Sequence, residues 1–314
     1  MKDALSKSIR HQSLKMMKRR WQMYIFLLIP LVWLVVFKYL PMVGVQIAFR
    51  NYKIKYGIWN SEWVGLYQFQ KFFQSYQFER VLTNTIRLSL YGLIAGFPLP
   101  ILLALCLNAI MNLKYKKFAQ TLLYIPHFVS TVVLVGMILQ IFNIRVGLYG
   151  YFGRLFTGVT PKDLLGTAAA FPHIYVWSGV WQSMGWSSII YIAALSSVDA
   201  ELHEAAQIDG ASRFQRCIHI DFPSILPTAT ILLIMNTGHV LSVGFEKTYL
   251  LQNPLNLKTS EVISTYVYKV SMVAGGSNDF SYATAIDLFN SIINMSLLIC
   301  VNMISRKVGE TSLW

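Results

Sequence analysis

Residues 204–227 read EAAQIDGASRFQRCIHIDFPSILP, a short and mostly polar segment that lies between two long apolar stretches. Its first half is rich in good helix formers, so the segment is compatible with a helix. A hydrophilic helix between two apolar, membrane-crossing stretches is poorly suited to a buried core. We therefore expect it to lie at the membrane surface, where a soluble partner can contact it.

The composition of the whole chain is that of a membrane protein. Of its 314 residues, 55% are hydrophobic and only 13% are charged, whereas soluble domains have about 25% charged residues. The apolar residues gather in stretches close to or above the roughly 18–20 residues that cross a bilayer. We predict an all-α, polytopic membrane protein with six transmembrane helices. These cover residues 22–49, 81–111, 118–142, 171–196, 222–245 and 282–304.

Basic residues predict the orientation and the division of the chain. The first 20 residues contain seven Lys and Arg, and others follow at 114–117 and 306–307. The positive-inside rule then places both termini in the cytoplasm. The net charge of +13 is better explained by topology and by attraction to anionic membrane lipid than by nucleic-acid binding.

Four regions are predicted along the chain. They are a basic cytoplasmic segment (1–20), the first transmembrane helix with an external loop (21–80), a five-helix core that contains the internal loop 197–221 (81–305), and a cytoplasmic tail (306–314).

Local signals inside the internal loop predict two short helices separated by a turn. Asp199 is a suitable N-cap, and Glu201 in the first turn complements the helix dipole. Gly210 permits a turn that a side chain would obstruct. A second helix after it would present Phe214 as an exposed apolar side chain.

The same loop resembles the EAA loop of the permeases of ABC importers. The matching positions are Glu204-Ala205-Ala206, Asp209-Gly210-Ala211, Ile220, Pro223 and Pro227. Phe222 stands where that family more often has Leu. The resemblance implies a coupling helix that docks in a cleft of the ATP-hydrolysing subunit. The residues expected to dock are Glu204, Ala205, Ala206, Asp209 and Gly210, with Phe214 beside them.

Further stretches, within residues 30–49, 63–66 and 124–126, resemble the polysaccharide-type branch of the carbohydrate importer permeases. This resemblance implies the transmembrane domain of a type I ABC importer in the cytoplasmic membrane of a bacterial cell. It also implies a second homologous permease, two ATP-binding subunits and an extracytoplasmic solute-binding protein. The chain has no G-x-x-x-x-G-K-[ST] phosphate loop. We therefore expect a transport subunit and not an enzyme, with no cofactor of its own, and with ATP and Mg bound by the partner ATPases.

Polar residues inside the predicted spans are candidates for a sugar site, since they are costly in a bilayer. Amide and hydroxyl groups suit sugar hydroxyls, and aromatic faces suit sugar C–H surfaces. Related importers bind sugar near mid-membrane, on the spans that flank the coupling loop. The candidates are Ser183, Trp186, Asn236, His239, His127 and Ser130. The competing interpretation is that such side chains only bond neighbouring helices.

The leading prediction is a permease subunit of an ATP-driven, binding-protein-dependent oligosaccharide importer. The predicted external loops hold 11 Lys and Arg against 6 Asp and Glu, which motivates the hypothesis of an acidic, uronate-containing substrate. Arg87, inside the second span, would either pair with Asp287 or contact that acidic sugar. The alternatives are an ABC permease for another small solute, such as a glycerol phosphate or a polyamine, and a stand-alone secondary transporter or channel. A membrane enzyme is least favoured, because no convergent catalytic set is visible.

Overall fold

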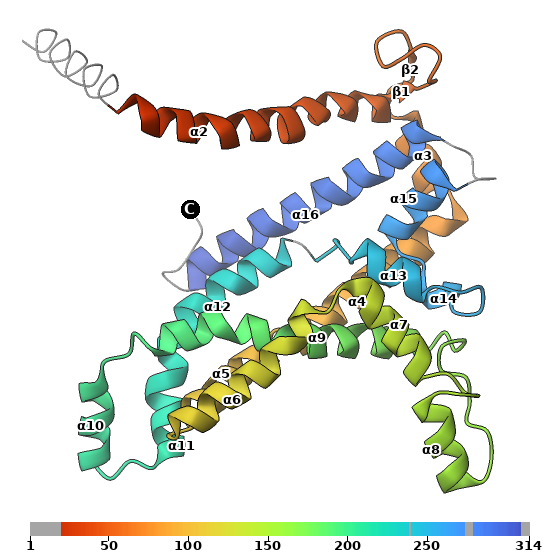
Figure 1. Ribbon diagram of the computed structural model, residues 1–314. Coiled ribbons are helices and arrows are strands. Elements are labelled where there is room, and N and C mark those ends of the chain that lie inside the picture. The colour runs from red at the N-terminus through yellow and green to blue at the C-terminus, as the bar shows by residue number, and fades with distance from the viewer. Residues whose placement is uncertain (1–19, 239, 274–278, 309–314) are drawn as a thin grey trace, which may run out of the picture. The chain divides into compact units, whose positions relative to one another are not determined.

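The computed structural model describes residues 20–238, 240–273 and 279–308 of a mainly helical chain (Figure 1). The chain divides into two compact units, one ending at Tyr67 and the other beginning at Gln68. Three parts of the predictions lie outside the described residues. They are His239, the tail after Val308 and the basic N-terminal segment apart from Arg20.

The N-terminal unit carries the first long apolar segment. Helix α2 (Trp21–Leu34) continues through a π-helical turn, η1 (Val35–Tyr39), into the 3-10 helix η2 (Leu40–Phe49). Pro41 lies at the start of η2. Because proline has no N–H, it cannot continue the α-helical bonding of the preceding turn, and π or 3-10 adjustments re-pair the freed carbonyl groups.

A two-stranded sheet follows in the same unit, which the all-α prediction did not include. Strand β1 (Arg50–Asn51) pairs antiparallel with β2 (Glu62–Trp63). The guanidinium of Arg50 closes the connecting loop. It donates to the carbonyl oxygen of Ser61 at 2.9 Å and lies 5.5 Å from the ring centre of Trp63. One arginine thus orders part of the segment that was predicted as an external loop.

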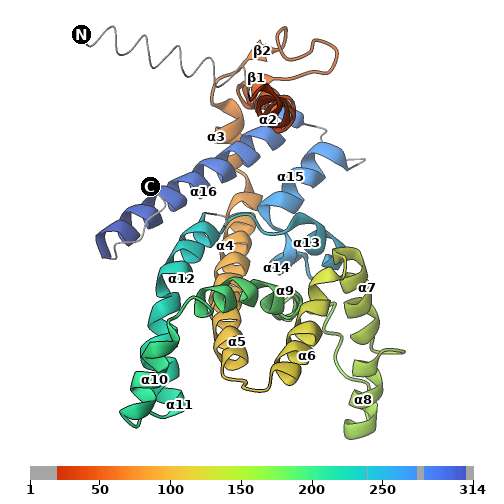
Figure 2. The ribbon, with the colours of Figure 1, turned by 60° about the vertical axis from the view of Figure 1, so that its left-hand side comes forward.

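The second unit contains the other helices. They are α3 (Tyr67–Phe73), α4 (Tyr76–Gly96), α5 (Pro98–Asn108), α6 (Leu113–Tyr124), η3 (Ile125–Phe128), α7 (Thr131–Ile141), α8 (Leu148–Thr157), α9 (Phe171–Leu195), α10 (Ala200–Ile208), α11 (Arg213–Arg216), η4 (Cys217–Asp221), α12 (Phe222–Thr237), α13 (Phe245–Leu251), α14 (Leu257–Ser260), α15 (Ile263–Met272) and α16 (Phe280–Val308). Helix α9 crosses the middle of this unit, and α4, α5 and α12 pack against it (Figure 2).

The prediction of six spans is not confirmed for the described residues. Four helical segments are long and apolar enough to cross a membrane: Trp21–Phe49, Tyr76–Asn108, Arg213–Thr237 and Phe280–Lys307. A fifth is obtained only if α6–η3 and α7, which meet at a bend of 95°, count as one span. Helix α9, the predicted fourth span, has 25 residues and is therefore about 37 Å long, but it is not apolar enough to belong to this set.

The bend in the predicted third span follows from its sequence. Pro126 lies in the first turn of η3, and the backbone is extended at Val129 and Ser130. The Ser130 hydroxyl then caps α7 by accepting the N–H of Val133 at 3.4 Å. The side-chain amide of Gln182 in α9 donates to the carbonyl of Val129 at 2.7 Å. A carbonyl that the bend frees is thereby satisfied, as an apolar environment requires.

The buried core of the second unit is built around α9. One cluster joins α5, α9 and α12, and its members are Ile101, Ala104, Tyr191, Leu195, Ile225 and Ala229. On another side, α6 approaches α9 at Gly185. A Cβ atom at Gly185 would lie 2.0 Å from the carbonyl oxygen of Leu123. Only glycine permits this backbone contact.

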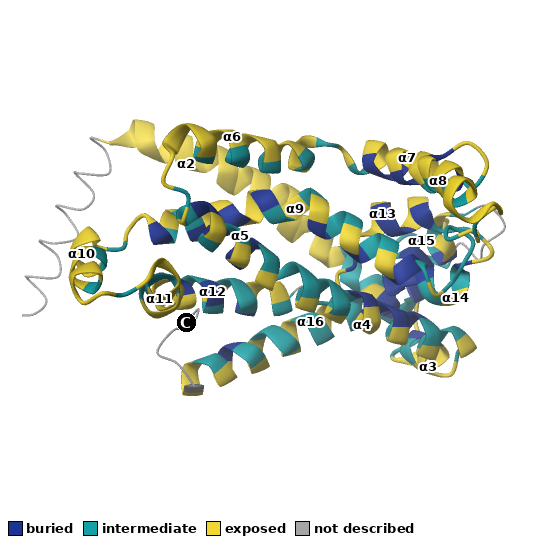
Figure 3. Ribbon diagram, turned by 90° about the horizontal axis from the view of Figure 1, so that it is seen from below, coloured by how far each residue is buried: buried dark blue, intermediate teal, exposed yellow. Residues whose placement is uncertain are grey.

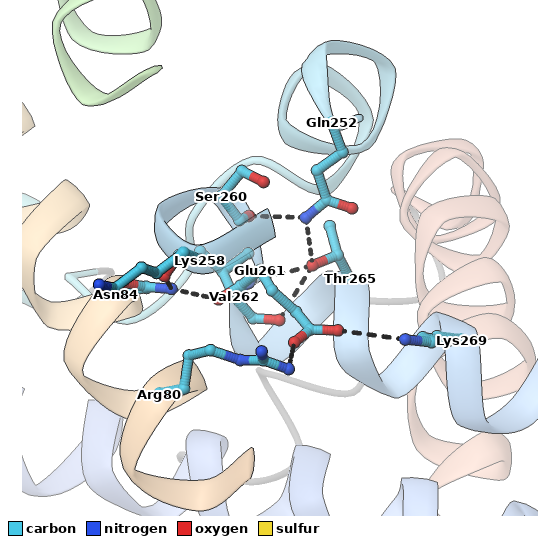
Figure 4. Close-up of polar contacts among 9 residues, drawn as sticks. All are labelled: Arg80, Asn84, Gln252, Lys258, Ser260, Glu261, Val262, Thr265 and Lys269. Carbon is cyan, nitrogen blue, oxygen red and sulfur yellow. Dashed lines mark hydrogen bonds and ion pairs between the residues drawn. The ribbon is translucent and has the colours of Figure 1, made fainter. Parts of the chain in front are cut away.

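The predicted external loop 246–281 contains three helices, α13 to α15, and a polar network fastens them to α4 (Figure 4). Glu261, whose side chain is only 3% exposed, forms ion pairs with Arg80 and, at 3.5 Å, with Lys269. The side-chain amide of Asn84 donates to the carbonyl groups of Lys258 and Glu261, both at 3.0 Å. This end of the unit is therefore a fixed platform and not an open loop.

We predict that replacing Arg80 destabilises the protein more than replacing Lys269, the other basic partner of Glu261. Arg80→Met leaves the buried Glu261 carboxylate without its closer partner. We expect a loss of about 2 kcal/mol of stability, the typical cost of a buried unsatisfied polar group. Thermal unfolding of the detergent-purified protein measures it. Lys269→Met is the matched control: because its side chain is 60% exposed, we expect a loss of about 0.5 kcal/mol. Equal losses would contradict this account of the network.

Candidate functional site

The polar segment of the internal loop projects from one end of the second unit. Helices α10 and α11 lie at this end, and α13 to α15 lie at the opposite end (Figure 3). Glu204, Ala205, Asp209 and Gly210 are exposed, and Ala206 is half-buried. The segment is thus accessible to another molecule, as the sequence predicted.

The predicted local structure of this segment is confirmed. Asp199 caps α10 by accepting the N–H of Glu201 at 3.0 Å. After α10 the chain turns at Gly210, whose φ is +78°, in the left-handed region that favours glycine. Ser212 then caps α11 in a reciprocal capping box with Gln215.

Two large apolar side chains stand out from this polar surface. Phe214, which was predicted, is 73% exposed, and Ile208, which was not, is 88% exposed. Isolated apolar side chains on a surface are common. Two of them on the two helices of one projecting loop give it apolar contact points for a partner. The sequence signal for Ile208 is its place at the last position of α10, directly before Asp209-Gly210.

A polar contact missed by the sequence analysis joins this loop to the membrane helices. His203 of α10 lies 3.3 Å from the carboxylate of Asp221, the last residue of η4, which directly precedes α12. The side-chain amide of Asn108, at the end of α5, donates to the same carboxylate at 3.4 Å. Asp221 is buried. The position of α10 is therefore linked directly to α5 and α12.

Two adjoining cavities lie along α9. The first, here called the polar cavity, has a volume of ≈ 370 Å³. It is lined by Leu88, Ser89, Gly92, Leu93, Gly96, Phe97, Tyr175, Ser183, Ser187, Asn236, Val240, Ser242, Val243 and Gly244. The second, here called the tryptophan cavity, has a volume of ≈ 590 Å³. It is lined by Gly96, Phe97, Pro100, Trp186, Ser187, Ile189, Ile190, Tyr191, Ala193, Leu232 and Asn236.

The structure brings most of the predicted sugar-site residues together. Ser183 and Asn236 line the polar cavity, and Trp186 and Asn236 line the tryptophan cavity. The imidazole of His127 stacks on the Trp186 ring, with centres 4.5 Å apart and planes 4° from parallel. Ser130 caps α7 and is not among the residues that line either cavity. An aromatic surface and an amide thus face the same space, an arrangement that suits sugars.

Apart from Ser183, the serines that line the polar cavity, Ser89, Ser187 and Ser242, were not predicted. Ser89, Gly92 and Gly96 follow one face of α4 at helical spacing. Tyr175, Ser183 and the missed Ser187 lie on one face of α9 in the same way. The recurrence of small and polar residues at this spacing is the sequence pattern from which these cavity-lining residues could have been predicted. The pattern is weak evidence by itself, because small residues are also common where helices pack together.

The predicted pairing of Arg87 with Asp287 is wrong. Both side chains are exposed, and no ion pair joins them among the described residues. Arg87 does not line the polar or the tryptophan cavity either. The neighbouring residue, Leu88, turns its side chain into the core instead.

Comparison with known proteins finds relatives over nearly the whole chain. Residues 96–310 match the family described as "Binding-protein-dependent transport system inner membrane component". The chain is 38% identical to protein LplB of Bacillus subtilis (strain 168), over 95% of this chain and 92% of LplB. It is also 38% identical to the polygalacturonan/rhamnogalacturonan transport system permease protein YteP of the same organism, over 96% of this chain and 92% of YteP.

Solved structures show the same fold. One is the crystal structure of a bacterial ABC transporter involved in the import of the acidic polysaccharide alginate. Another is the bacterial alginate ABC transporter in complex with alginate pentasaccharide-bound periplasmic protein. A chain of each matches with a TM-score of 0.86 and 36% identity, covering 95% of this chain and 99% of that chain. On these matches, this chain belongs to the family of inner-membrane components of binding-protein-dependent transport systems.

Proposed function

We propose that this chain is one permease subunit of an ATP-driven importer of acidic oligosaccharides in the bacterial cytoplasmic membrane. The proposed substrate class rests on the 36% identity of this chain, over nearly its whole length, to a chain of a transporter of the acidic polysaccharide alginate. The 38% identity to a permease named for polygalacturonan and rhamnogalacturonan, which are rich in uronic acids, points the same way. The polar and tryptophan cavities offer hydroxyls, an amide and an aromatic face to such a solute.

The exposed loop supports a role in ATP coupling. Glu204, Ala205, Ala206, Asp209 and Gly210 form the surface that docks on an ATPase, and Ile208 and Phe214 supply its apolar contacts. The contact of His203 with Asp221 carries movement of α10 to α5 and α12. ATP hydrolysis belongs to two partner subunits, so this chain is a transport subunit with cytoplasmic termini. A second homologous permease completes the pathway, and an extracytoplasmic binding protein delivers the solute.

Within the chain, Ser183, Trp186 and Asn236 contact the passing sugar, and His127 positions the ring of Trp186 by stacking on it. His239 belongs to the same proposed site through its sequence position. A permease for a glycerol phosphate or another small solute is the alternative within this family. The two differ in solute size, which an oligosaccharide of defined length distinguishes.

Substrate-stimulated ATPase activity tests the proposed substrate class. The complete complex, with its binding protein, is assayed with oligogalacturonides of defined length, with neutral maltooligosaccharides of equal length, and with glycerol 3-phosphate. We expect stimulation by the oligogalacturonide alone, because binding energy that differs between the solutes is what allows discrimination. Stimulation by glycerol 3-phosphate but by no oligosaccharide would reject the proposal.

A further inference from the structure

A buried lysine lies beside the polar cavity without an acidic partner. Lys247 of α13 is only 9% exposed. Its ammonium group donates to the carbonyl of Tyr175 at 2.8 Å and lies 4.9 Å from the centre of the Tyr175 ring. Within the part of the chain that the structure describes, no carboxylate pairs with it. Because a buried charge without a counter-ion is costly, packing alone is a poor explanation for a lysine here.

Lys247 is not itself a lining residue of the polar cavity, but its ammonium group contacts residues that are next to that cavity or line it. Tyr175, which accepts its hydrogen bond, lines that cavity, and so does Gly244 near the start of α13. A Cβ atom at Gly179 would lie 3.1 Å from the Lys247 nitrogen. Ser183, which also lines the cavity, lies one turn further along α9 than Gly179. One turn corresponds to about 5.4 Å, so the ammonium lies beside α9 about one turn before Ser183.

The cavity also has unused capacity for hydrogen bonds. The hydroxyl of Ser89 is buried and has no hydrogen-bond partner, although buried polar groups are nearly always paired. The Ser183 hydroxyl donates to the carbonyl of Gly179 at 2.8 Å and can still accept a bond. The Lys247 ammonium has three donors, one of which the Tyr175 carbonyl occupies.

We propose that Lys247, Ser89 and Ser183 form a subsite for one uronate unit of the transported oligosaccharide, in which Lys247 binds the carboxylate and the serines bind the hydroxyls. This inference rests on the proposed function and names the group that selects for charge. Burial lowers the pKa of Lys247 to about 8, so its ammonium is mostly protonated at neutral pH. The carboxylate of a bound uronate supplies the counter-ion that the Lys247 ammonium otherwise lacks. Lys247 is again without a counter-ion when the solute leaves.

Uptake by the complete complex in proteoliposomes tests the subsite. The two probes are trigalacturonate and its fully methyl-esterified form, which has the same length and hydroxyls but no charge. Lys247→Met keeps the length of the side chain and removes the charge. Relative to wild type, we expect it to lower trigalacturonate uptake about tenfold, in keeping with a lost charge-assisted hydrogen bond. Uptake of the ester is expected to change by no more than about twofold, the scale of a weak neutral contact.

Two further variants make the result specific. Lys247→Gln retains a donor for the Tyr175 carbonyl, and it is expected to lose the same selectivity even if Lys247→Met fails to fold. Lys258→Met removes an exposed lysine from the neighbouring helix α14 and is expected to leave the ratio of the two uptakes unchanged. If wild type imports trigalacturonate and both Lys247 variants keep its uptake ratio, the subsite is rejected. If wild type imports neither probe, the proposed function itself fails.

Discussion

Gly210→Val is expected to abolish most ATP-driven uptake. The backbone at Gly210 has a φ of +78°, which costs an L-residue about 1–2 kcal/mol and a β-branched residue more. A Cβ atom there would meet nothing within 4 Å, so the effect comes from backbone strain and not from a clash. The turn between α10 and α11 must rearrange, and the exposed surface around Asp209 changes shape. Since about 1.4 kcal/mol is a factor of ten in affinity, we expect ATPase docking to weaken tenfold or more.

Two measurements separate this effect from misfolding. Co-purification of the ATPase subunits with the variant reports docking, and the thermal midpoint of the isolated chain reports folding. Gly136→Val is the control, because Gly136 lies in α7, has no positive φ and also has open space around it. The Gly210 variant should lose ATPase association while the Gly136 variant keeps it. Full association of both would contradict the proposed role of this loop.

Asn236→Leu is expected to have the second largest effect. Asn236 lines both the polar and the tryptophan cavity, so a solute that passes from one to the other meets this amide. Its removal leaves sugar hydroxyls without a partner. The typical penalty of about 1–3 kcal/mol corresponds to a roughly 5- to 150-fold loss of uptake.

This loss should occur without a change in ATPase association. The exposed loop of α10 and α11 is remote from the substitution, at the far end of α12 (Figure 1). Met235→Leu, at the adjacent and 49% exposed position of the same helix, controls for a change in the apolar surface of α12. Unchanged uptake by Asn236→Leu would remove Asn236 from the site. Equal losses in both variants would point to a defect in helix packing.

Local signals in the sequence predicted the local structure of the internal loop well. Asp199, Glu201 and Gly210 act through bonds and dihedral angles within a few residues of themselves, and the observed cap and turn follow from them. The likeness of residues 204–227 to the EAA loop agrees with the family match. The local structure of a short motif can therefore be predicted from the sequence when it depends only on residues within the motif.

Features that depend on contacts distant in the sequence were not predicted. The bend after Pro126 requires the carbonyl of Val129 to be paired by Gln182, 53 positions away. The location of Lys247 beside Tyr175 spans 72 positions. The prediction that Arg87 pairs with Asp287 was wrong for the same reason. Hydropathy indicates how deep a residue lies in the membrane, but it does not indicate toward which neighbouring helix its side chain points. The six-span prediction is not confirmed for the described residues, because α9 carries polar residues along a helix of sufficient length.

ATP-dependent uptake of an oligogalacturonide tests the central claim most directly. Proteoliposomes contain this chain, a candidate sister permease and the ATPase subunits, with binding protein and labelled trigalacturonate outside and ATP enclosed. The account predicts accumulation that requires enclosed ATP and is lost with Gly210→Val. Accumulation of equal size without ATP, or in vesicles that hold this chain alone, would contradict it and identify a stand-alone transporter.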